Sequence, residues 1–360
     1  MPVDMPCPGQ VLPVRVLITT VKVPFVSGGA EVLASQLRHN LIVAGHEAEL
    51  VEIPFKWYPP ECILDQMLAC RLLDLSESCY VGVDRVIGLK FPAYLIPHPN
   101  KVLWILHQHR QAYDLWAAGD LYQQPNGSLV RDAIVQADRK LLADARSIFT
   151  IAENVSQRLQ KYCGISSTPL YNPPLGAEHY FCGADRGYLF FPSRLNPGSK
   201  RQGLVLEALA RTKEPVRILF AGAPEVPAMA AELQHLAESL GVKNRVEWLG
   251  NVPEEEKRNL YAHARGVVFT PYDEDYGYVT LEAMLAAKPV VTCSDSGGSL
   301  EFVRQRETGL IAAPEPVKLA EALDELWQSP SQARIWGEAG RERYDSLNIN
   351  WNNVIDKLLA

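Results

Sequence analysis

Short apolar segments rich in β-branched residues alternate with longer, helix-forming segments along most of this 360-residue chain. Short apolar runs of this kind are typical of buried strands. Helices between consecutive strands indicate that the strands run parallel, in a sheet that is covered on both faces. The alternation therefore predicts an α/β fold.

The two kinds of segment can be assigned by residue number. The predicted strands lie at residues 14–20, 47–53, 85–89, 101–107, 146–151, 188–192, 216–222, 245–249, 266–270, 289–292 and 309–312. The predicted helices lie at residues 30–43, 61–75, 128–143, 153–162, 200–212, 225–240, 253–264, 278–287, 297–306 and 316–328, and a helical tail follows.

The alternation weakens once, over residues 168–187, where three prolines and three glycines interrupt the pattern. This composition is typical of an interdomain linker, and at roughly 100–200 residues per domain the length favours two domains. We predict doubly wound domains over residues 1–175 and 188–340, with a C-terminal helix over 341–360. Because such sheets bind ligands at the carboxyl ends of their strands, two facing domains would share one site in a central cleft.

Charge and cysteine content exclude several classes of protein. A formal net charge of −7 is unlike that of nucleic-acid-binding proteins, which neutralise phosphates with Lys and Arg. Seven cysteines without a CxxC pair argue against a disulfide framework or a zinc ribbon and favour reduced thiols in the cytoplasm. No segment has the ~18 consecutive apolar residues of a membrane-spanning helix, and residues 1–10 lack the features of a signal peptide.

Residues 271–284, PYDEDYGYVTLEAM, form the segment with the most chemical information. A strand leads into an acidic turn, a glycine and a helix, with Glu274 in the loop and Glu282 about one turn inside the helix. N–H groups at the start of that helix would favour an anion. A carboxylate beside an anion suits sugar hydroxyls, because it can accept two hydrogen bonds from them. The structural alternative is an acidic turn that only caps the helix.

A basic loop over residues 191–203, FPSRLNPGSKRQG, follows the first strand of the second domain. Its Arg194 and Lys200 are two cations close to the start of a helix, an arrangement that suits a diphosphate. The alternative is a solvated basic loop. Arg201, next to Lys200, is predicted to point elsewhere and to lie at the surface.

Two features of the first domain add further candidates. Gly28 and Gly29 follow the first strand and would let the backbone approach a ligand closely. The GxGxxG fingerprint is missing, which argues against a dinucleotide-dependent oxidoreductase. His107 ends a strand, where it would either contact a sugar hydroxyl or be a satisfied strand-end histidine. His109 and Arg110 are weaker candidates for contacts with an acceptor.

Together these motifs resemble those of retaining glycosyltransferases with the GT-B fold, in particular glycosyltransferase family 4. The family signature contains two glutamates separated by seven residues, and residues 274–284 (EDYGYVTLEAM) are similar to its E-G-F-G-L-x-x-L-E-A-M form. Further elements that resemble the family are Gly297-Gly298 with Glu301, Thr308-Gly309-Leu310, Arg194 with Lys200-x-x-Gly203, and Gly28-Gly29. The resemblance covers about residues 14–345.

The resemblance implies roles for the charged residues. Glu282 would hold the ribose hydroxyls of a nucleotide, and Glu274 would bind hydroxyls of the donor sugar. Arg194 and Lys200 would take up the negative charge that develops on the leaving diphosphate, where stabilisation of the transition state matters most.

Backbone and loop contacts are implied as well. N–H groups of Tyr278, Val279 and Thr280 would share the charge of the diphosphate. Asn251 and Val252 would contact the base.

The resemblance also implies that residues 1–175 bind the acceptor and that residues 188–340 bind the nucleotide sugar. The first domain would contribute Gly28 and Gly29, close to the phosphates, and His107, close to the donor sugar. The tail would cross back to this domain. The implied fold is GT-B, with two Rossmann-like domains facing a central cleft. The implied reaction moves a hexose from a UDP- or GDP-sugar to a hydroxyl of a glycan or lipid-linked acceptor, with retention of configuration. We expect no cofactor and a role in polysaccharide biosynthesis. We expect a cytoplasmic enzyme, for which peripheral contact with the inner membrane face stays open.

Three alternatives stay open. Asp273, Glu274 and Asp275 also fit a DxD pattern, which in other glycosyltransferases holds a divalent metal. In those enzymes the pattern ends a strand within a single domain, whereas here it leads into a helix of a second domain. We therefore expect no metal. A GT-B sugar-nucleotide epimerase and a non-catalytic nucleotide-sugar-binding subunit are the other two alternatives.

Overall fold

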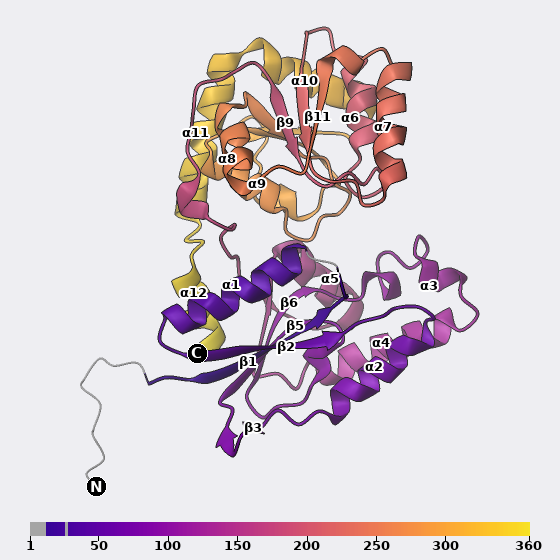
Figure 1. Ribbon diagram of the computed structural model, residues 1–360, viewed down its shortest axis with the longest axis vertical. Helices are drawn as coiled ribbons and strands as arrows, with labels where there is room; N and C mark the ends of the chain where they lie inside the picture. The colour runs from indigo at the N-terminus through magenta and orange to yellow at the C-terminus, as the bar shows by residue number, and fades with distance from the viewer. Residues whose placement is uncertain (1–11, 26–27) are drawn as a thin grey trace. The chain divides into compact units, whose positions relative to one another are not determined.

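The computed structural model of the chain describes residues 12–25 and 28–360. It consists of two compact units, which we call unit 1 (Met1–Asn172 with Asn350–Ala360) and unit 2 (Pro173–Ile349). Each unit contains one six-stranded parallel sheet (Figure 1). The chain passes from unit 1 to unit 2 after Asn172, within the linker-like segment 168–187, and residues 341–349 belong to unit 2.

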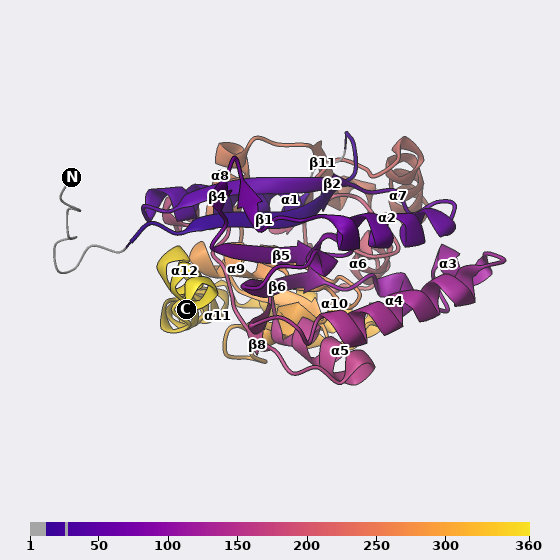
Figure 2. The same cartoon turned by 90° about the horizontal axis from the view of Figure 1, so that it is seen from below.

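The sheet of unit 1 has the strand order β2-β1-β5-β6-β7-β8, and Figure 2 shows β2, β1, β5 and β6 side by side. Its strands are β1 (Arg15–Lys22), β2 (Glu47–Pro54), β5 (Arg85–Lys90), β6 (Lys101–His107), β7 (Ser147–Thr150) and β8 (Thr168–Pro169). Its helices are α1 (Gly29–Val43), α2 (Glu61–Leu72), α3 (Asp120–Gln123), α4 (Gly127–Leu141), α5 (Glu153–Cys163) and α12 (Trp351–Leu359), with 3-10 turns η1 (Ala93–Leu95), η2 (Arg110–Ala112). Helices α1 and α12 cover one face, and α2 and α4 cover the other (Figure 1).

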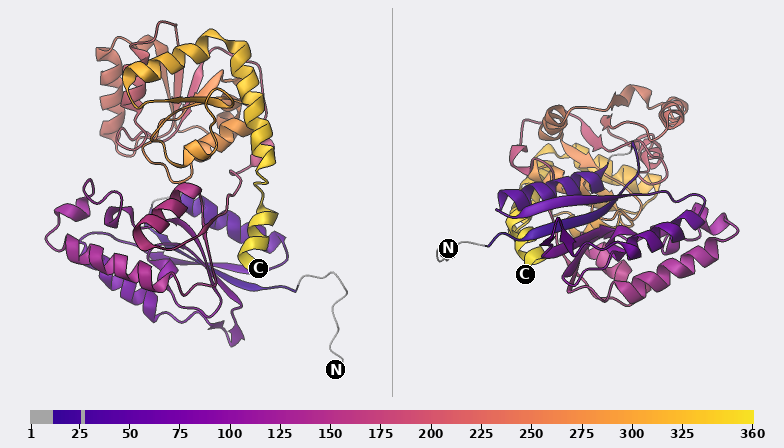
Figure 3. Two further views of the ribbon diagram at one scale, coloured as in Figure 1. Left: turned by 180° about the vertical axis from the view of Figure 1, so that it is seen from behind. Right: turned by 60° about the horizontal axis from the view of Figure 1, so that its bottom comes forward.

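The last helix of the chain, α12, packs against unit 1 beside α1 (Figure 3). Val354 and Leu358 on its apolar face are fully buried. The buried guanidinium of Arg85 donates hydrogen bonds to the carbonyl oxygens of Leu358 at 2.8 Å and Leu359 at 3.1 Å. A cation at a helix C-terminus is stabilising because it meets the negative end of the helix dipole. Arg85 therefore anchors the end of the chain to the sheet of unit 1.

The sheet of unit 2 has the strand order β11-β10-β9-β12-β13-β14. Its strands are β9 (Leu189–Pro192), β10 (Ile218–Ala221), β11 (Val246–Gly250), β12 (Gly266–Val268), β13 (Val290–Cys293) and β14 (Gly309–Ala312). Its helices are α6 (Gln202–Leu209), α7 (Pro227–Ser239), α8 (Glu254–His263), α9 (Tyr278–Leu285), α10 (Pro316–Gln328) and α11 (Pro330–Ser346), with 3-10 turns η3 (Ala177–His179), η4 (Lys243–Arg245) and η5 (Gly298–Glu301). Counted along the chain, the order is 3-2-1-4-5-6, which is that of dinucleotide-binding folds.

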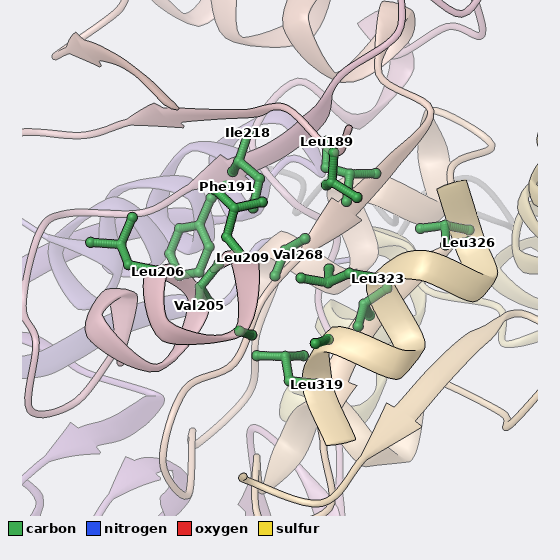
Figure 4. Close-up of a cluster of buried hydrophobic side chains, with 14 of the residues drawn as sticks. Leu189, Phe191, Val205, Leu206, Leu209, Ile218, Val268, Leu319, Leu323 and Leu326 are labelled. Carbon is green, nitrogen blue, oxygen red and sulfur yellow. The ribbon is translucent and has the colours of Figure 1, made fainter. Parts of the chain in front are cut away.

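The hydrophobic core of unit 2 lies where its helices pack against the sheet. In Figure 4, Leu206 and Leu209 of α6 and Leu319 and Leu323 of α10 gather around side chains of the strands, such as Phe191. All five side chains are fully buried, and each such burial stabilises the folded state by roughly 1.5–3 kcal/mol. The predicted α/β fold with two parallel sheets is confirmed.

One predicted helix is wrong. Residues 297–306 form only the short 3-10 turn η5 and then a loop. Gly297 has a φ of 60°, in the left-handed region, and a Cβ on Gly298 would lie 2.5 Å from the carbonyl oxygen of Asp275. The loop is therefore held against residues 274–277, a tertiary constraint that overrides the helical pattern. The short hairpin of β3 (Glu77–Ser78) and β4 (Val81–Gly82) and the edge strand β8 were not predicted, because two residues leave no periodic signal.

Two sequence expectations concern membranes and export. Across residues 12–25 and 28–360, no helix combines the length and the apolar character needed to cross a bilayer. Residues 1–10, which lack the features of a signal peptide, lie outside the described residues.

Candidate functional site

The sheet of unit 2 changes its direction of growth between β9 and β12. Doubly wound sheets bind ligands at this switch point, beside the carboxyl ends of the strands. The loop after β9 carries Lys200 and the loop after β12 carries Glu274, and their side chains form an ion pair. Both side chains are only partly exposed, at 13% for Lys200 and 25% for Glu274. The structure thus joins two predicted site residues that lie 74 positions apart in the chain.

Backbone hydrogen bonds join the loops at this edge. The N–H of Tyr272 donates to the carbonyl of Ser199 at 2.9 Å, which links the loop after β12 to the loop after β9. The N–H of Gly298 donates to the carbonyl of Glu274 at 2.7 Å, which links the loop after β13 to the loop after β12. Three loops thus position the Lys200–Glu274 pair.

Arg201 makes a further connection between these loops. Its guanidinium contacts both carboxylate oxygens of Asp295, at 2.7 and 2.8 Å, and donates to the carbonyls of Thr270 and Pro271 at 2.7 Å each. The prediction that Arg201 lies at the surface is wrong, because the side chain is only 15% exposed. Its acidic partner follows 94 residues later, after a different strand, so the local sequence contains no sign of the pair.

The start of α9 requires a glycine. Gly277 has a φ of 85°, in the left-handed region, and a Cβ there would lie 2.7 Å from Oγ of Ser299. The N–H of Thr280 donates to the carbonyl of Gly277 at 2.9 Å and so serves the first turn of the helix. Of the three backbone donors predicted for a phosphate, Thr280 thus has a partner within the helix itself.

Glu282, the second glutamate of the signature, is a buried residue of α9. Its carboxylate accepts a hydrogen bond from the hydroxyl of Tyr261 at 2.6 Å and pairs with the ammonium of Lys257 at 3.2 Å. Lys257 also pairs with Glu254 at 2.9 Å. Sequence reasoning missed Lys257 and Tyr261. Their spacing of four residues puts them on one face of α8, but nothing local to α8 indicates that this face meets α9.

Both of these partners of Glu282 keep their protons. Burial, together with the negative charge of Glu282, raises the pKa of Tyr261 well above its ordinary value, so the hydroxyl keeps its proton. Burial lowers the pKa of Lys257, but the charges of Glu282 and Glu254 outweigh that effect, and the net shift is upward. The carboxylate is therefore held between a hydroxyl donor and an ammonium group.

The remaining unit 2 candidates lie at the same edge of the sheet. Arg194 is an exposed residue of the loop that holds Lys200, and its carbonyl accepts a hydrogen bond from the Gln202 side chain at 2.9 Å. Asn251 and Val252 form the loop between β11 and α8.

Three predicted residues belong to unit 1. Gly28 is the N-cap of α1, and its N–H donates to the carboxylate of Glu31 at 2.8 Å, so a side-chain anion already occupies this helix start. Gly29 is the first residue of α1. His107 ends β6, and its Nδ1 lies 2.7 Å from the carbonyl oxygen of Gln108.

The acidic triplet of the DxD pattern, Asp273 to Asp275, lies in the loop after β12. In the part of the chain that the structure describes, no group of three or more His, Cys, Asp or Glu side chains could hold a metal ion.

Comparisons with known proteins find similarity mainly in unit 2. Residues 183–343 match the family model described as glycosyl transferases group 1. The alpha-1,3/1,6-mannosyltransferase ALG2 of Homo sapiens is 30% identical over 157 residues, which are 40% of this chain and 38% of that protein. The chain spans less than two-fifths of the length of the curated relatives it matches first.

Solved structures resemble almost the whole chain. Sucrose-phosphate synthase from Thermosynechococcus elongatus superposes with a TM-score of 0.77 at 17% identity, over 96% of this chain and 98% of that one. Anabaena HepE, solved in complex with UDP and glucose, superposes with a TM-score of 0.66 at 16% identity, over 96% and 98% of the two chains. At these identities the likeness establishes the fold, which is GT-B.

Proposed function

We propose that this chain, whose unit 2 is a glycosyl transferases group 1 domain on a GT-B fold, transfers a sugar from a nucleotide-diphosphate donor to a hydroxyl group. The Lys200–Glu274 pair at the switch point of unit 2 carries the proposal. This pair combines a cation suited to a diphosphate with a carboxylate suited to sugar hydroxyls. Glu282 adds a second oriented carboxylate on the following helix.

Each side chain has a task in the proposed reaction. Glu282 holds the ribose, Glu274 holds the donor sugar, and Arg194 and Lys200 neutralise the diphosphate. The bond between the anomeric carbon and the diphosphate oxygen breaks as the acceptor oxygen bonds to the same face. The acceptor proton passes to the leaving phosphate, and the configuration is retained. Charge builds up on the leaving group in the transition state, where a fixed ammonium stabilises it most.

The donor in the proposal is a UDP- or GDP-hexose and the acceptor is a glycan or a lipid-linked glycan in a cytoplasmic pathway of polysaccharide synthesis. The mannosyltransferase relative supports a hexose, and the UDP and glucose in the HepE structure support a nucleotide sugar. Contributions from His107, Gly28 and Gly29 stay predictions. The variant His107→Ala tests the contribution of His107 through the donor KM. No cofactor and no metal enter the proposal.

A two-step experiment tests it. Thermal unfolding of the full chain is measured with UDP, GDP and their common hexose derivatives, because a donor that binds the folded state raises the melting temperature by mass action. Products are then analysed with and without EDTA, in the presence of simple glycoside acceptors.

We expect one nucleotide sugar to stabilise the chain and its sugar to appear on an acceptor, or slowly on water, with EDTA present. Conversion of the donor to an isomer would identify an epimerase, and binding without transfer or hydrolysis would identify a binding subunit. Loss of activity in EDTA that manganese restores would favour the DxD hypothesis.

A further inference from the structure

A cavity of about 270 Å³ lies entirely within unit 1. One wall comes from residues 57–63, which follow β2 and begin α2, and the other from residues 109–124, which follow β6. Both wall segments leave the carboxyl ends of their strands, the edge at which doubly wound sheets bind ligands. The functional site of unit 2 uses none of these residues.

Two aromatic rings form part of the apolar surface of the cavity, together with Pro59, Pro60, Ile63 and Leu121. Trp57 and Tyr58 are 39% and 59% exposed, and their ring centroids lie 5.3 Å apart with the planes at 82°. The rings thus form a corner. The face of an aromatic ring carries partial negative charge and attracts polarised C–H groups, and both side chains also bring a polar group.

The polar part of the lining carries no fixed cation. Among the described residues that line the cavity are Asp120 and the amides of Gln111, Gln123 and Gln124, and none of them is Lys or Arg. This composition disfavours a phosphate, which needs positive charge. Amides and a carboxylate offer both donors and acceptors to hydroxyl groups.

His109 also lines the cavity, and its protonation matters. The ring packs against Phe55 and Phe91, with centroids 6.2 and 5.5 Å away. Burial, followed by the nearby His107, lowers the pKa of His109 to about 4. At neutral pH the ring is uncharged, so it offers one donor and one acceptor to a neutral ligand.

The polar wall is held in place by its own hydrogen bonds. The side-chain oxygen of Gln111 accepts from the N–H of Leu121 at 3.2 Å, and the Asn126 amide donates to Glu61 at 2.5 Å. A Cβ on Gly127 would lie 1.8 Å from the carbonyl oxygen of Leu121, so only glycine allows this close approach. A cavity fixed in this way loses little conformational freedom on binding.

We propose that this cavity binds one sugar ring of the acceptor, with Trp57 and Tyr58 against the ring and Asp120, Gln111 and His109 on its hydroxyls. The inference rests on the proposed function, which requires a glycan acceptor, and adds the place in unit 1 at which one of its sugar rings binds. The volume is slightly below the ~300–1,000 Å³ of pockets for drug-sized ligands, which favours a single ring over an extended chain.

The test measures the binding of methyl glycosides of mannose, glucose, galactose and N-acetylglucosamine to the full chain by saturation-transfer NMR. Trp57→Ala and Asp120→Asn are compared with Tyr122→Ala. Tyr122 is a matched control, because it is an aromatic residue of the segment 109–124, 57% exposed and packed edge-to-face against Trp116, and it does not line the cavity. UDP and GDP binding is measured on the same samples.

We expect at least one glycoside to bind the unmodified chain, with at least tenfold weaker binding in Trp57→Ala and in Asp120→Asn and little change in Tyr122→Ala. If Trp57→Ala fails to fold, Asp120→Asn decides. Nucleotide binding without glycoside binding would overturn this inference and leave the proposed function standing. Glycoside binding without nucleotide binding would overturn the proposed function and leave a sugar site in unit 1.

A lipid surface is the competing occupant, because exposed Trp and Tyr also favour membrane interfaces. Sedimentation with vesicles of phosphatidylethanolamine and phosphatidylglycerol tests it with the same variants. Vesicle binding that Trp57→Ala abolishes, together with no glycoside binding by the unmodified chain, would overturn the proposal.

Discussion

The two units of this protein share one architecture and differ in the chemistry at the carboxyl edge of their sheets. In unit 2 the loops at this edge carry charged pairs, Lys200 with Glu274 and Arg201 with Asp295. In unit 1 the corresponding loops carry the rings of Trp57, Tyr58 and His109 around a cavity. The parallel sheet therefore supplies an edge on which loops can be built, and the loops decide which ligand is bound.

The ligands that we propose for the two units account for the recognisable motif in unit 2. A diphosphate and a ribose need cations, carboxylates and N–H groups at set positions, and that requirement leaves a pattern such as the two glutamates seven residues apart. A sugar ring needs an aromatic face and a few polar groups, which many different sequences can supply. The matched family region, residues 183–343, accordingly lies within unit 2.

Lys200→Ala should cause the largest loss of activity among these variants, and the loss should concern only the reaction of the donor. Removal of one group that stabilises transition-state charge costs on the order of 100-fold in kcat, with a smaller change in the donor KM. Steady-state donor turnover measures both constants. Lys243→Ala removes a 70% exposed lysine of the same unit that pairs with Glu238, and should change neither. A Lys200→Ala enzyme with unmodified kcat would contradict the proposed role of unit 2.

Glu282→Ala should raise the donor KM by about 10–100-fold, because hydrogen bonds to a charged group are worth about 1.5–3 kcal/mol. Tyr261→Phe, which removes only a hydrogen bond that orients Glu282, should raise the KM less. Both variants should leave glycoside binding in unit 1 unchanged. Glu247→Ala, at an exposed position of β11, is the control. Equal KM values in all three variants would show that Glu282 does not hold the donor.

Arg85→Ala should destabilise unit 1 by about 2 kcal/mol, because it removes charged hydrogen bonds to the end of α12. Urea unfolding gives the free energy, and limited proteolysis should release the last residues of the chain more readily. Arg38→Ala removes an ion pair between a 40% exposed arginine and a 68% exposed Glu49, which is worth less than about 1 kcal/mol. Equal losses of unfolding free energy in the two variants would mean that Arg85 does not anchor α12.

Asp138 in α4 should give unit 1 an unusual dependence on pH. The residue is fully buried and accepts hydrogen bonds from Tyr94 at 2.9 Å and Tyr113 at 2.6 Å, close to Cys163 and Gln108. Burial raises its pKa to about 6, against ~3.9 in an unfolded chain.

Because the folded state favours the protonated form, this contribution to stability is full below about pH 4 and is lost as the pH rises through 6. The slope is at most about 1.4 kcal/mol per pH unit. Urea unfolding between pH 4 and 7 should show a steeper fall for the unmodified chain than for Asp138→Asn. Parallel pH profiles of the unfolding free energy would contradict the raised pKa of Asp138.

The ends of the predicted strands agree with the structure to within about two residues, because a buried parallel strand needs a short apolar run whatever surrounds it. The predicted strand at residues 101–107 and the helix at 316–328 agree with β6 and α10 at both ends. The helix predicted over 297–306 failed where Gly298 packs against Asp275, a contact between separate loops. Local pattern alone cannot weigh such a contact.

The sequence pattern was enough to locate the candidate residues of unit 2, since Lys200 and Glu274 lie in loops after predicted strands and Glu282 lies in a predicted helix. The side-chain partners became known only from the folded structure, in which Arg201 pairs with Asp295 and Tyr261 donates to Glu282. The same holds for Trp57 and His109, which line one cavity. The physical reason is the range of the interactions. Helices and turns are built from hydrogen bonds between near neighbours in the chain, whereas these partners meet only once the strand order is set.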